Sequence, residues 1–244
     1  KNKGAIRREK LGSIEFKDTT YRYPEADLDT LRSINLSVNE GEKVAILGRN
    51  GSGKSTLMKL ASGLFKASDG LVMYDGVDIK QLHTDDLSRS IGIVLQDVQL
   101  FSGSIRENIT MGRQDINQDD LISAGKLSGL DDFVSKIPGG YDLQLSDGGK
   151  GLSGGQRQSI ALARAIVHKP THFILDEPTS AMDMNAENIF ISQMGSIMQD
   201  STMLIVTHRM PLLNLVDRII VMNEGQIVED GPKEEIINKL NQPR

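Results

Sequence analysis

Gly48-Arg49-Asn50-Gly51-Ser52-Gly53-Lys54-Ser55 is a complete phosphate-binding loop of the form G-x-x-x-x-G-K-[ST]. The apolar run 43–47 before it predicts a buried strand, and residues from about 54 to 64 predict a helix. Strand, glycine loop and helix in this order form the context in which the motif holds phosphate. The glycines allow the backbone to approach the phosphates, and successive N–H groups at the helix start attract the anion. The stretch therefore predicts a nucleotide site in an α/β fold.

A later apolar run ends in two carboxylates, in the stretch Phe173-Ile174-Leu175-Asp176-Glu177. A strand that ends in an acid places the carboxylate at the carboxyl edge of a parallel sheet, where ligands bind in open α/β folds. Lys54 can then supply charge to the outer phosphates, while Ser55 ligates Mg²⁺ directly and Asp176 holds it through water. Glu177 is positioned to orient and polarise the attacking water. These residues predict metal-assisted phosphoryl transfer.

Between these two motifs lies a second glycine-rich helix start, Leu152-Ser153-Gly154-Gly155-Gln156. Ser153 is placed as the N-cap of a helix predicted to continue to about Val167, and Pro170 ends that helix. A helix start with two glycines is a second potential anion-binding terminus.

The remaining pattern predicts an antiparallel β layer at the start and a helical insertion in the middle of the chain. Strands are expected at 14–23, 34–38, 91–95, 172–175 and 203–206, hairpins at 70–79 and 218–229, and helices at 119–130, 132–136, 185–198 and 232–240, with Pro232 in the first turn of the last. The predicted fold class is α/β: a phosphate-loop core with an antiparallel β subdomain and an inserted helical subdomain at about 100–168.

Composition restricts the class of protein. The chain has 244 residues, of which 38% are hydrophobic and 25% charged, as is ordinary for a globular domain. The net charge of −5 argues against a general nucleic-acid binder. No apolar run approaches the roughly 20 residues that span a bilayer. Because cysteine is absent, disulfides and thiolate metal sites are excluded.

The first ten residues differ in character, with five basic residues and one acidic residue. They have two interpretations: a mobile, solvated tail, or a linker from a membrane domain whose cations suit anionic headgroups.

Together, the three motifs in this order resemble the ABC (ATP-binding cassette) ATPases, and the resemblance extends from about Gly12 to Leu240. It implies ATP and Mg²⁺ as cofactors and ATP hydrolysis as the activity. Gln96, after a strand, resembles the family's Q-loop hinge, and His208 resembles the switch histidine that contacts the γ-phosphate. Tyr23, before a proline, resembles the aromatic residue that stacks on adenine, with Tyr21 as its competitor. The other three histidines, His83, His168 and His172, match no motif and are interpreted as structural.

The resemblance assigns the site residues as follows. Catalytic roles fall to Lys54, Gln96, Glu177 and His208, and metal binding to Ser55, Gln96 and Asp176. Nucleotide binding is assigned to Tyr23, Gly48, Arg49, Asn50, Gly51, Ser52, Gly53, Lys54, Ser55, Thr56, Gln96, Ser153, Gly154, Gly155, Gln156 and, in the D-loop Ser180-Ala181-Met182-Asp183, Asp183. In this family each ATP lies between one chain's phosphate loop and the LSGGQ segment of a second copy, so a head-to-tail homodimer is implied.

Within the family the chain looks like an exporter cassette. No heptad run interrupts it, unlike the chromosome-maintenance ATPases, and it carries one cassette, unlike the translation-associated relatives with two. The run from Gln96 to Ile109 is exporter-like, although Ser146-Asp147-Gly148-Gly149 replaces the Gly-Glu-Arg-Gly type of segment usual there. Met182, where leucine is commoner, resembles the type I secretion ATPases of RTX toxins and large adhesins. Residues 1–11 would then be the linker and 12–244 the nucleotide-binding domain.

The type I secretion resemblance implies a set of partners and a location. The partners are the chain's own N-terminal transmembrane domain, membrane-fusion and outer-membrane secretion proteins, and a polypeptide cargo, with no nucleic acid. The location is the cytoplasmic face of the bacterial inner membrane. The alternatives are a cassette of a lipid or drug exporter, with identical chemistry, and a non-transport ABC ATPase such as a DNA-associated clamp.

Overall fold

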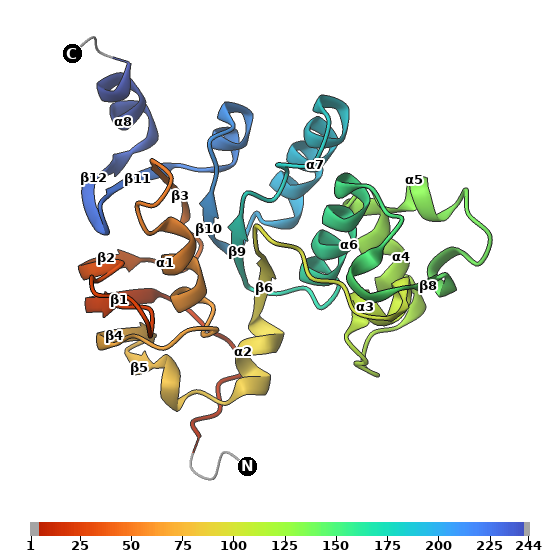
Figure 1. Ribbon diagram of the computed structural model, residues 1–244, viewed down its shortest axis with the longest axis horizontal. Helices are drawn as coiled ribbons and strands as arrows, with labels where there is room; N and C mark the ends of the chain where they lie inside the picture. The colour runs from red at the N-terminus through yellow and green to blue at the C-terminus, as the bar shows by residue number, and fades with distance from the viewer. Residues whose placement is uncertain (1–4, 242–244) are drawn as a thin grey trace.

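Two sheets stand side by side, and a group of helices forms a lobe beside the larger one (Figure 1). The computed structural model describes residues 5–241. The ends of the predicted linker and domain, residues 1–4 and 242–244, therefore lie outside the described residues.

The larger sheet has six strands in the order β12-β11-β3-β10-β9-β6. Their bounds are β3 Lys43–Gly48, β6 Ile91–Val94, β9 His172–Asp176, β10 Thr202–Val206, β11 Arg218–Asn223 and β12 Gln226–Pro232. Neighbours pair in parallel except β12, which returns antiparallel to β11. Every residue of β9 and β10 is buried, as expected for parallel strands covered on both faces. The parallel register brings the carboxyl ends of these strands to one edge.

The smaller sheet is antiparallel, in the order β2-β1-β4-β5. Its strands are β1 Ile14–Tyr21, β2 Leu31–Val38, β4 Asp69–Tyr74 and β5 Val77–Asp78. It packs with α1 (Lys54–Ala61) in one hydrophobic core, where Phe16 and Leu57 are almost fully buried. The buried Tyr74 hydroxyl donates to the Ala61 carbonyl at 2.7 Å, which fixes the end of α1 on this sheet.

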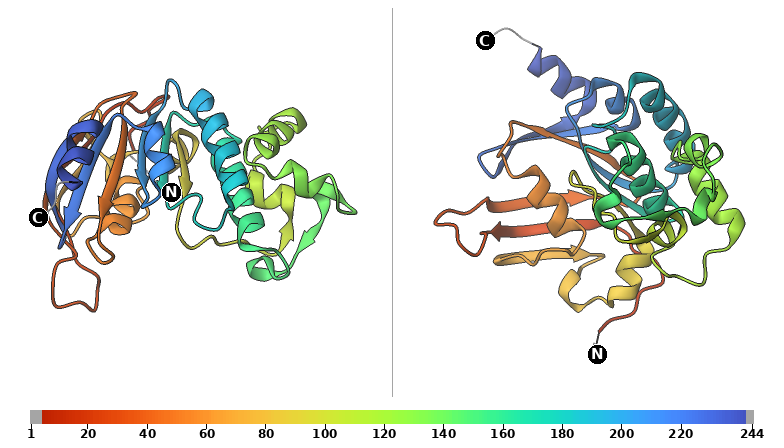
Figure 2. Two further views of the ribbon diagram at one scale, coloured as in Figure 1. Left: turned by 90° about the horizontal axis from the view of Figure 1, so that it is seen from above. Right: turned by 45° about the vertical axis from the view of Figure 1, so that its right-hand side comes forward.

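Residues 103–166 form the helical lobe, which projects from one end of the molecule in the left view of Figure 2. It contains β7 Gly103–Ser104, α3 Ile105–Thr110, α4 Gln118–Leu127, α5 Asp131–Val134, η2 Gly140–Asp142, β8 Gln144–Leu145, η3 Asp147–Gly149 and α6 Gly154–Ile166. Helix α6 belongs to two cores, because Ile160 and Ala163 face the lobe whereas Leu162 and Ile166 face the large sheet.

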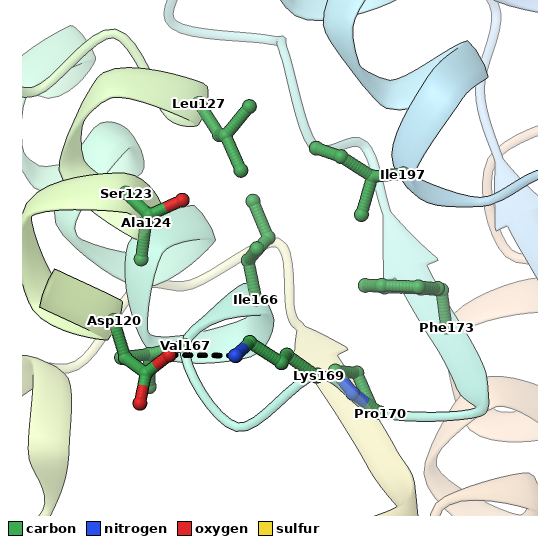
Figure 3. A pocket seen from close by; sticks show the side chains of 10 residues that line it. All are labelled: Asp120, Ser123, Ala124, Leu127, Ile166, Val167, Lys169, Pro170, Phe173 and Ile197. Atoms are coloured by element: carbon green, nitrogen blue, oxygen red, sulfur yellow. Dashed lines mark ion pairs between the residues drawn. The ribbon is translucent and has the colours of Figure 1, made fainter. Parts of the chain in front are cut away.

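Away from α6, the helical lobe packs less closely against the larger sheet. An apolar cleft of about 230 Å³ separates Leu127 of α4 from Phe173 of β9 and Ile197 of α7 (Met184–Ile197) (Figure 3). The ion pair between Asp120 and Lys169, 2.6 Å long, bridges one side of it (Figure 3). The joint between lobe and sheet therefore depends strongly on α6.

The remaining elements are η1 Ile79–Gln81, α2 Thr84–Ser90, η4 Met210–Leu215 and α8 Lys233–Leu240. Two of the short helices, α2 and α3, were not expected as separate elements. Pro232 ends β12 and precedes α8, so its predicted place in the first helical turn is wrong.

The N-terminal segment contacts η1 and α2. The Ile6 amide donates to the Gln81 carbonyl at 2.7 Å, and the Arg8 amide donates to the Asp86 carboxylate at 2.8 Å. Asp86 is buried and also pairs with the Arg7 guanidinium at 3.3 Å. A freely mobile tail is therefore wrong for residues 6–8, whereas the linker remains a prediction.

Candidate nucleotide-binding and catalytic site

Several of the predicted site residues meet around an open cavity of about 260 Å³ at the carboxyl edge of the parallel strands. It is lined by Thr30, Asn50, Gly51, Gly53, Lys54, Ser55, Thr56, Gln96, Asp176, Glu177 and Val206. The glycine loop follows β3, Gln96 follows β6, and Asp176 ends β9. Because Val206 of β10 pairs with both Asp176 and Ile46, the strand register itself assembles the site.

The glycine loop has a conformation that side chains would prevent. Gly48 has φ +153°, and a Cβ there would lie against the Met222 carbonyl and 2.7 Å from the Ser52 hydroxyl. Gly53 has φ +98° and is the N-cap of α1, where no side chain of the described residues caps the helix. The N–H groups of the first turn are thus left for an anion.

Lys54 folds back over this loop. Its ammonium donates to the carbonyls of Gly48 and Arg49 at 2.8 and 2.9 Å. Burial lowers the pKa of Lys54, while the nearby charges of Asp176 and Glu177 act in the opposite direction. The cation is therefore held between the glycine loop and the two acids, where the outer phosphates of a nucleotide would lie.

The residues fit Mg²⁺. The Ser55 hydroxyl donates to the Asp176 carboxylate, and burial raises the pKa of Asp176 despite that bond. Asp176 Oδ1 and Glu177 Oε2 are buried without a hydrogen-bond partner in the described structure. Within residues 5–241 no three His, Cys, Asp or Glu side chains cluster as metal ligands. The pair of the Ser55 hydroxyl and the Asp176 carboxylate suits Mg²⁺, which binds through one or two protein oxygens together with water and phosphate.

Glu177 lies at the start of the loop after β9. Its φ is +50°, a left-handed conformation uncommon outside glycine, and its amide donates to the Val206 carbonyl at 2.8 Å. Its carboxylate oxygen Oε1 lies within hydrogen-bonding distance of His208 Nδ1, at 2.7 Å. The Glu177 side chain is 12% exposed, whereas that of His208 is 79% exposed. The structure therefore brings together the carboxylate and the histidine that the sequence proposed for catalysis, 31 residues apart.

Tyr23 lies beside the phosphate loop rather than in the lining of the cavity. Its hydroxyl hydrogen-bonds the Thr56 hydroxyl at 3.1 Å, and its ring is half-buried. Tyr21 is buried and stacks on Phe65 at a centroid distance of 5.2 Å. This geometry favours Tyr23 over Tyr21 as the ring open to a base.

The second glycine-rich helix start opens into a different hollow, of about 340 Å³. Ser153, Gly154, Gly155, Gln156, Ala181, Met182 and Asp183 are among its lining residues, and of the described residues none also lines the first cavity. Ser153 accepts from the Gln156 amide at 3.1 Å, and the Gln156 side chain accepts from the Ser153 amide at 2.8 Å. Asp183 caps α7 through the Ala186 amide at 2.8 Å. Gln156 and Asp183, predicted as nucleotide ligands, thus have capping roles in the chain.

Two of the three histidines interpreted as structural have clear structural contacts. His172 is buried and its Nε2 lies 2.6 Å from the Gly12 carbonyl, while His83 caps α2. Burial lowers the pKa of both His168 and His172.

Sequence reasoning missed three residues near the site: Gln158, Glu187 and Arg209. The side-chain hydrogen bonds of Gln158 and Arg209, one of which is to Glu187, connect residues 19 to 29 positions apart, so no local pattern identifies them.

A family model described as ABC transporter matches residues 31–180. This stretch contains the glycine loop, Gln96, the LSGGQ segment and the two acids. The chain belongs to the ABC transporter family. The predicted family and fold are confirmed, and as a member this chain is an ATP-binding domain.

Three curated relatives come from export systems. The ABC transporter domain is 41% identical over 226 residues to the cyclolysin secretion/processing ATP-binding protein CyaB of Bordetella pertussis. It is 43% identical over 226 residues to the leukotoxin export ATP-binding protein LtxB of Aggregatibacter actinomycetemcomitans, and 42% over 230 residues to the leukotoxin translocation ATP-binding protein LktB of Mannheimia haemolytica. The alignments cover 93%, 93% and 94% of this chain, but only 32% of each relative.

A solved structure agrees with this placement. A bacterial Atm1-family ABC exporter with ATP bound matches with a TM-score of 0.86 and 31% identity, over 95% of this chain and 40% of that one. The predicted resemblance to exporter ATPases, and to the type I secretion group in particular, is borne out by these relatives. Among the described residues no helix combines the length and the apolar character needed to cross a membrane.

Proposed function

We propose that this ABC transporter domain hydrolyses ATP as a Mg²⁺-dependent, head-to-tail homodimer and thereby drives polypeptide export by a type I secretion exporter. The observation that carries the dimer is the separation of the two glycine-rich helix starts. Each has the form of an anion site, yet they open into separate cavities of one chain. A second copy would bring its LSGGQ segment over the first cavity and complete it.

The residues of the first cavity divide the work of phosphoryl transfer. The first turn of α1 binds the phosphates through its N–H groups, and Lys54 neutralises the outer ones. Ser55 and Asp176, with Gln96 in the lining of the same cavity, would hold Mg²⁺, which would neutralise charge that develops on the β- and γ-phosphates. Tyr23 would support the adenine from the side of Thr56.

Glu177 orients the attacking water and accepts its proton. Its carboxylate is fixed on one side by His208 at 2.7 Å, and Oε2 is buried without another partner in the described structure. That leaves Oε2 available to a water between the acid and the γ-phosphate. His208 is exposed enough to leave Glu177 and contact the γ-phosphate once ATP is bound.

The exporter assignment rests on the relatives. The chain spans about a third of the length of the curated relatives, which are named for cyclolysin secretion or leukotoxin export. We propose that a transmembrane domain precedes residues 1–11, which then act as the linker. On this proposal the domain lies at the cytoplasmic face of the bacterial inner membrane, with membrane-fusion and outer-membrane proteins as further partners.

The test is the size of the Glu177→Gln protein, measured by light scattering with and without Mg-ATP. This substitution keeps the shape of the side chain but removes its basicity, so ATP should bind and persist. We expect a monomer without nucleotide and a dimer with Mg-ATP. Glu234→Gln, on the exposed face of α8, is the matched control and should turn over ATP like the wild type. A Glu177→Gln protein that binds ATP and stays monomeric would contradict the proposed sandwich.

A further inference from the structure

Gln158 joins the LSGGQ helix to the catalytic loop. The side chain lies on α6, one helical turn beyond Ser153, and is 2% exposed. Its Nε2 donates to the Glu177 carbonyl at 3.0 Å and to the Ser180 hydroxyl at 3.3 Å. Its Oε1 accepts from the Ala181 amide at 3.0 Å. One buried amide thus satisfies three groups of the loop that starts at the catalytic acid.

These bonds matter because the Glu177 backbone is in an uncommon conformation. A backbone conformation with φ at +50° persists only if the surrounding structure holds it in place. The Glu177 amide donates to the Val206 carbonyl at 2.8 Å, and its carbonyl accepts from the Gln158 side chain at 3.0 Å and from the Ser180 amide at 3.2 Å. The peptide groups on both sides of the Cα are therefore held. The direction of the carboxylate toward His208 follows from that backbone. Of these three bonds, the one from Gln158 is the only one that comes from a side chain among the described residues.

The same loop packs closely on the start of α6. A Cβ at Gly154 would lie 3.2 Å from the Ala181 methyl, and one at Gly155 would lie 3.2 Å from the Ala181 carbonyl. The absence of side chains at both positions allows this approach. One packed unit is therefore formed by the start of α6, Gln158 and the loop after β9. A displacement of the start of α6 would also displace the backbone of Glu177.

We propose that Gln158 is a positioning residue for hydrolysis: it ties the backbone of Glu177 to the LSGGQ helix of the same chain. This inference rests on the proposed function only in taking Glu177 as the residue that orients the water. Binding of nucleotide at the phosphate loop does not depend on it, because the side-chain hydrogen bonds of Gln158 reach only Glu177 among the residues that line the first cavity.

The first test is Gln158→Met, which nearly preserves the side-chain volume and removes all three hydrogen bonds. We expect kcat to fall by between about tenfold and a hundredfold, the range expected when a catalytic group is misplaced by about 1 Å. KM and the ATP affinity should stay within about threefold, because the phosphate loop is intact. In the Glu177→Gln background the same substitution should leave ATP-dependent dimerisation in place.

The outcomes separate this inference from the proposed function. A wild-type protein without ATP turnover would contradict the proposed function itself. An active wild type with an equally active Gln158→Met variant would overturn the positioning role alone. A variant that loses ATP affinity in parallel with kcat would also overturn it, because the residue would then support the domain in general.

A second variant tests the hydrogen bond that Gln158 Nε2 donates to the Glu177 carbonyl, and its result does not depend on that of Gln158→Met. In Gln158→Glu the carboxyl can donate to the Glu177 carbonyl only when protonated, and its burial raises the pKa of such a group. The ratio of its kcat to that of the wild type should therefore rise as pH falls from about 8 to about 6. Gln199→Glu, on the surface after α7, is the control and should give a flat ratio. A flat ratio for Gln158→Glu would overturn the proposed bond.

Discussion

Arg209→Ala should lower the free energy of unfolding of this domain by more than the removal of an exposed surface charge does. The Arg209 guanidinium pairs with the Glu187 carboxylate at 2.5 Å and reaches the carbonyls of Ser180 and Met182 at 3.4 Å. Glu187 is 6% exposed, and its other donor is the Thr179 hydroxyl at 2.6 Å. Removing the arginine would leave a buried carboxylate with one neutral donor.

The magnitude follows from this burial. Breaking a buried ion pair by removing one partner destabilises a protein by about 3–5 kcal/mol. Arg209 is 28% exposed, so water partly screens the pair, and we expect a loss of about 2–3 kcal/mol. In a domain of this size each kcal/mol lowers Tm by about 2–4 °C, which gives a decrease of about 4–12 °C.

Thermal unfolding of four proteins tests this: the wild type, Arg209→Ala, Glu187→Ala and the double variant. The double variant leaves no unpaired charge, so its loss should be smaller than the sum of the single losses by about 1–2 kcal/mol. Lys239→Ala is the control, because that lysine and its partners Glu229 and Glu235 are all at least 44% exposed, and it should change stability by less than about 1 kcal/mol. Strict additivity of the two single losses, or an Arg209→Ala protein as stable as Lys239→Ala, would refute the reasoning.

Three further predictions concern the site. Lys54→Ala should weaken ATP binding by about tenfold or more, since it removes a charge-assisted contact, and a nucleotide titration that gives wild-type affinity would contradict its phosphate role. Tyr23→Ala should raise KM more than it lowers kcat, whereas Tyr23→Phe, which loses only the bond to Thr56, should change either constant by less than about threefold; the steady-state kinetics of both decide. Asp176→Asn should abolish Mg²⁺-dependent turnover but stabilise the nucleotide-free protein at neutral pH. Burial raises the pKa of Asp176, so the folded state is destabilised by the ionised group as pH rises through the raised pKa. The gain in Tm should therefore disappear below about pH 4, where the wild-type group is protonated in both states.

The sequence predicted that the site residues lie close together, for a simple reason. The loop after β3, Gln96 after β6 and Asp176 at the end of β9 each follow an apolar strand, and parallel strands share their carboxyl edge. The order of the motifs then identified the family. The short helix α3 could also have been found, because Ser104 and Glu107 form a capping box in the sequence.

The other features of the site depend on how α6 packs against the larger sheet, and no local sequence pattern encodes this packing. Gln158 follows the LSGGQ segment closely, but only the packing shows that its side chain turns toward Glu177 and Ala181 rather than toward solvent. The same applies to the pair of Arg209 and Glu187, which joins the segment after β10 to α7. The capping roles of Gln156 and Asp183 are likewise seen only in the structure, whereas their assignment to the nucleotide, which comes from the family resemblance, stays a prediction.

The two glycine-rich helix starts differ in a way that bears on the proposed dimer. The start of α1 is capped by a glycine with no side-chain acceptor among the described residues, so its N–H groups are open to phosphate. The start of α6 is closed by its own capping box, in which Ser153 already accepts from the Gln156 amide. A phosphate arriving at α6 must compete with that internal bond, whereas one at α1 meets no such competitor. ATP should therefore bind first at α1, and the weaker contact with α6 should form only when the nucleotide is presented by a second, already loaded chain.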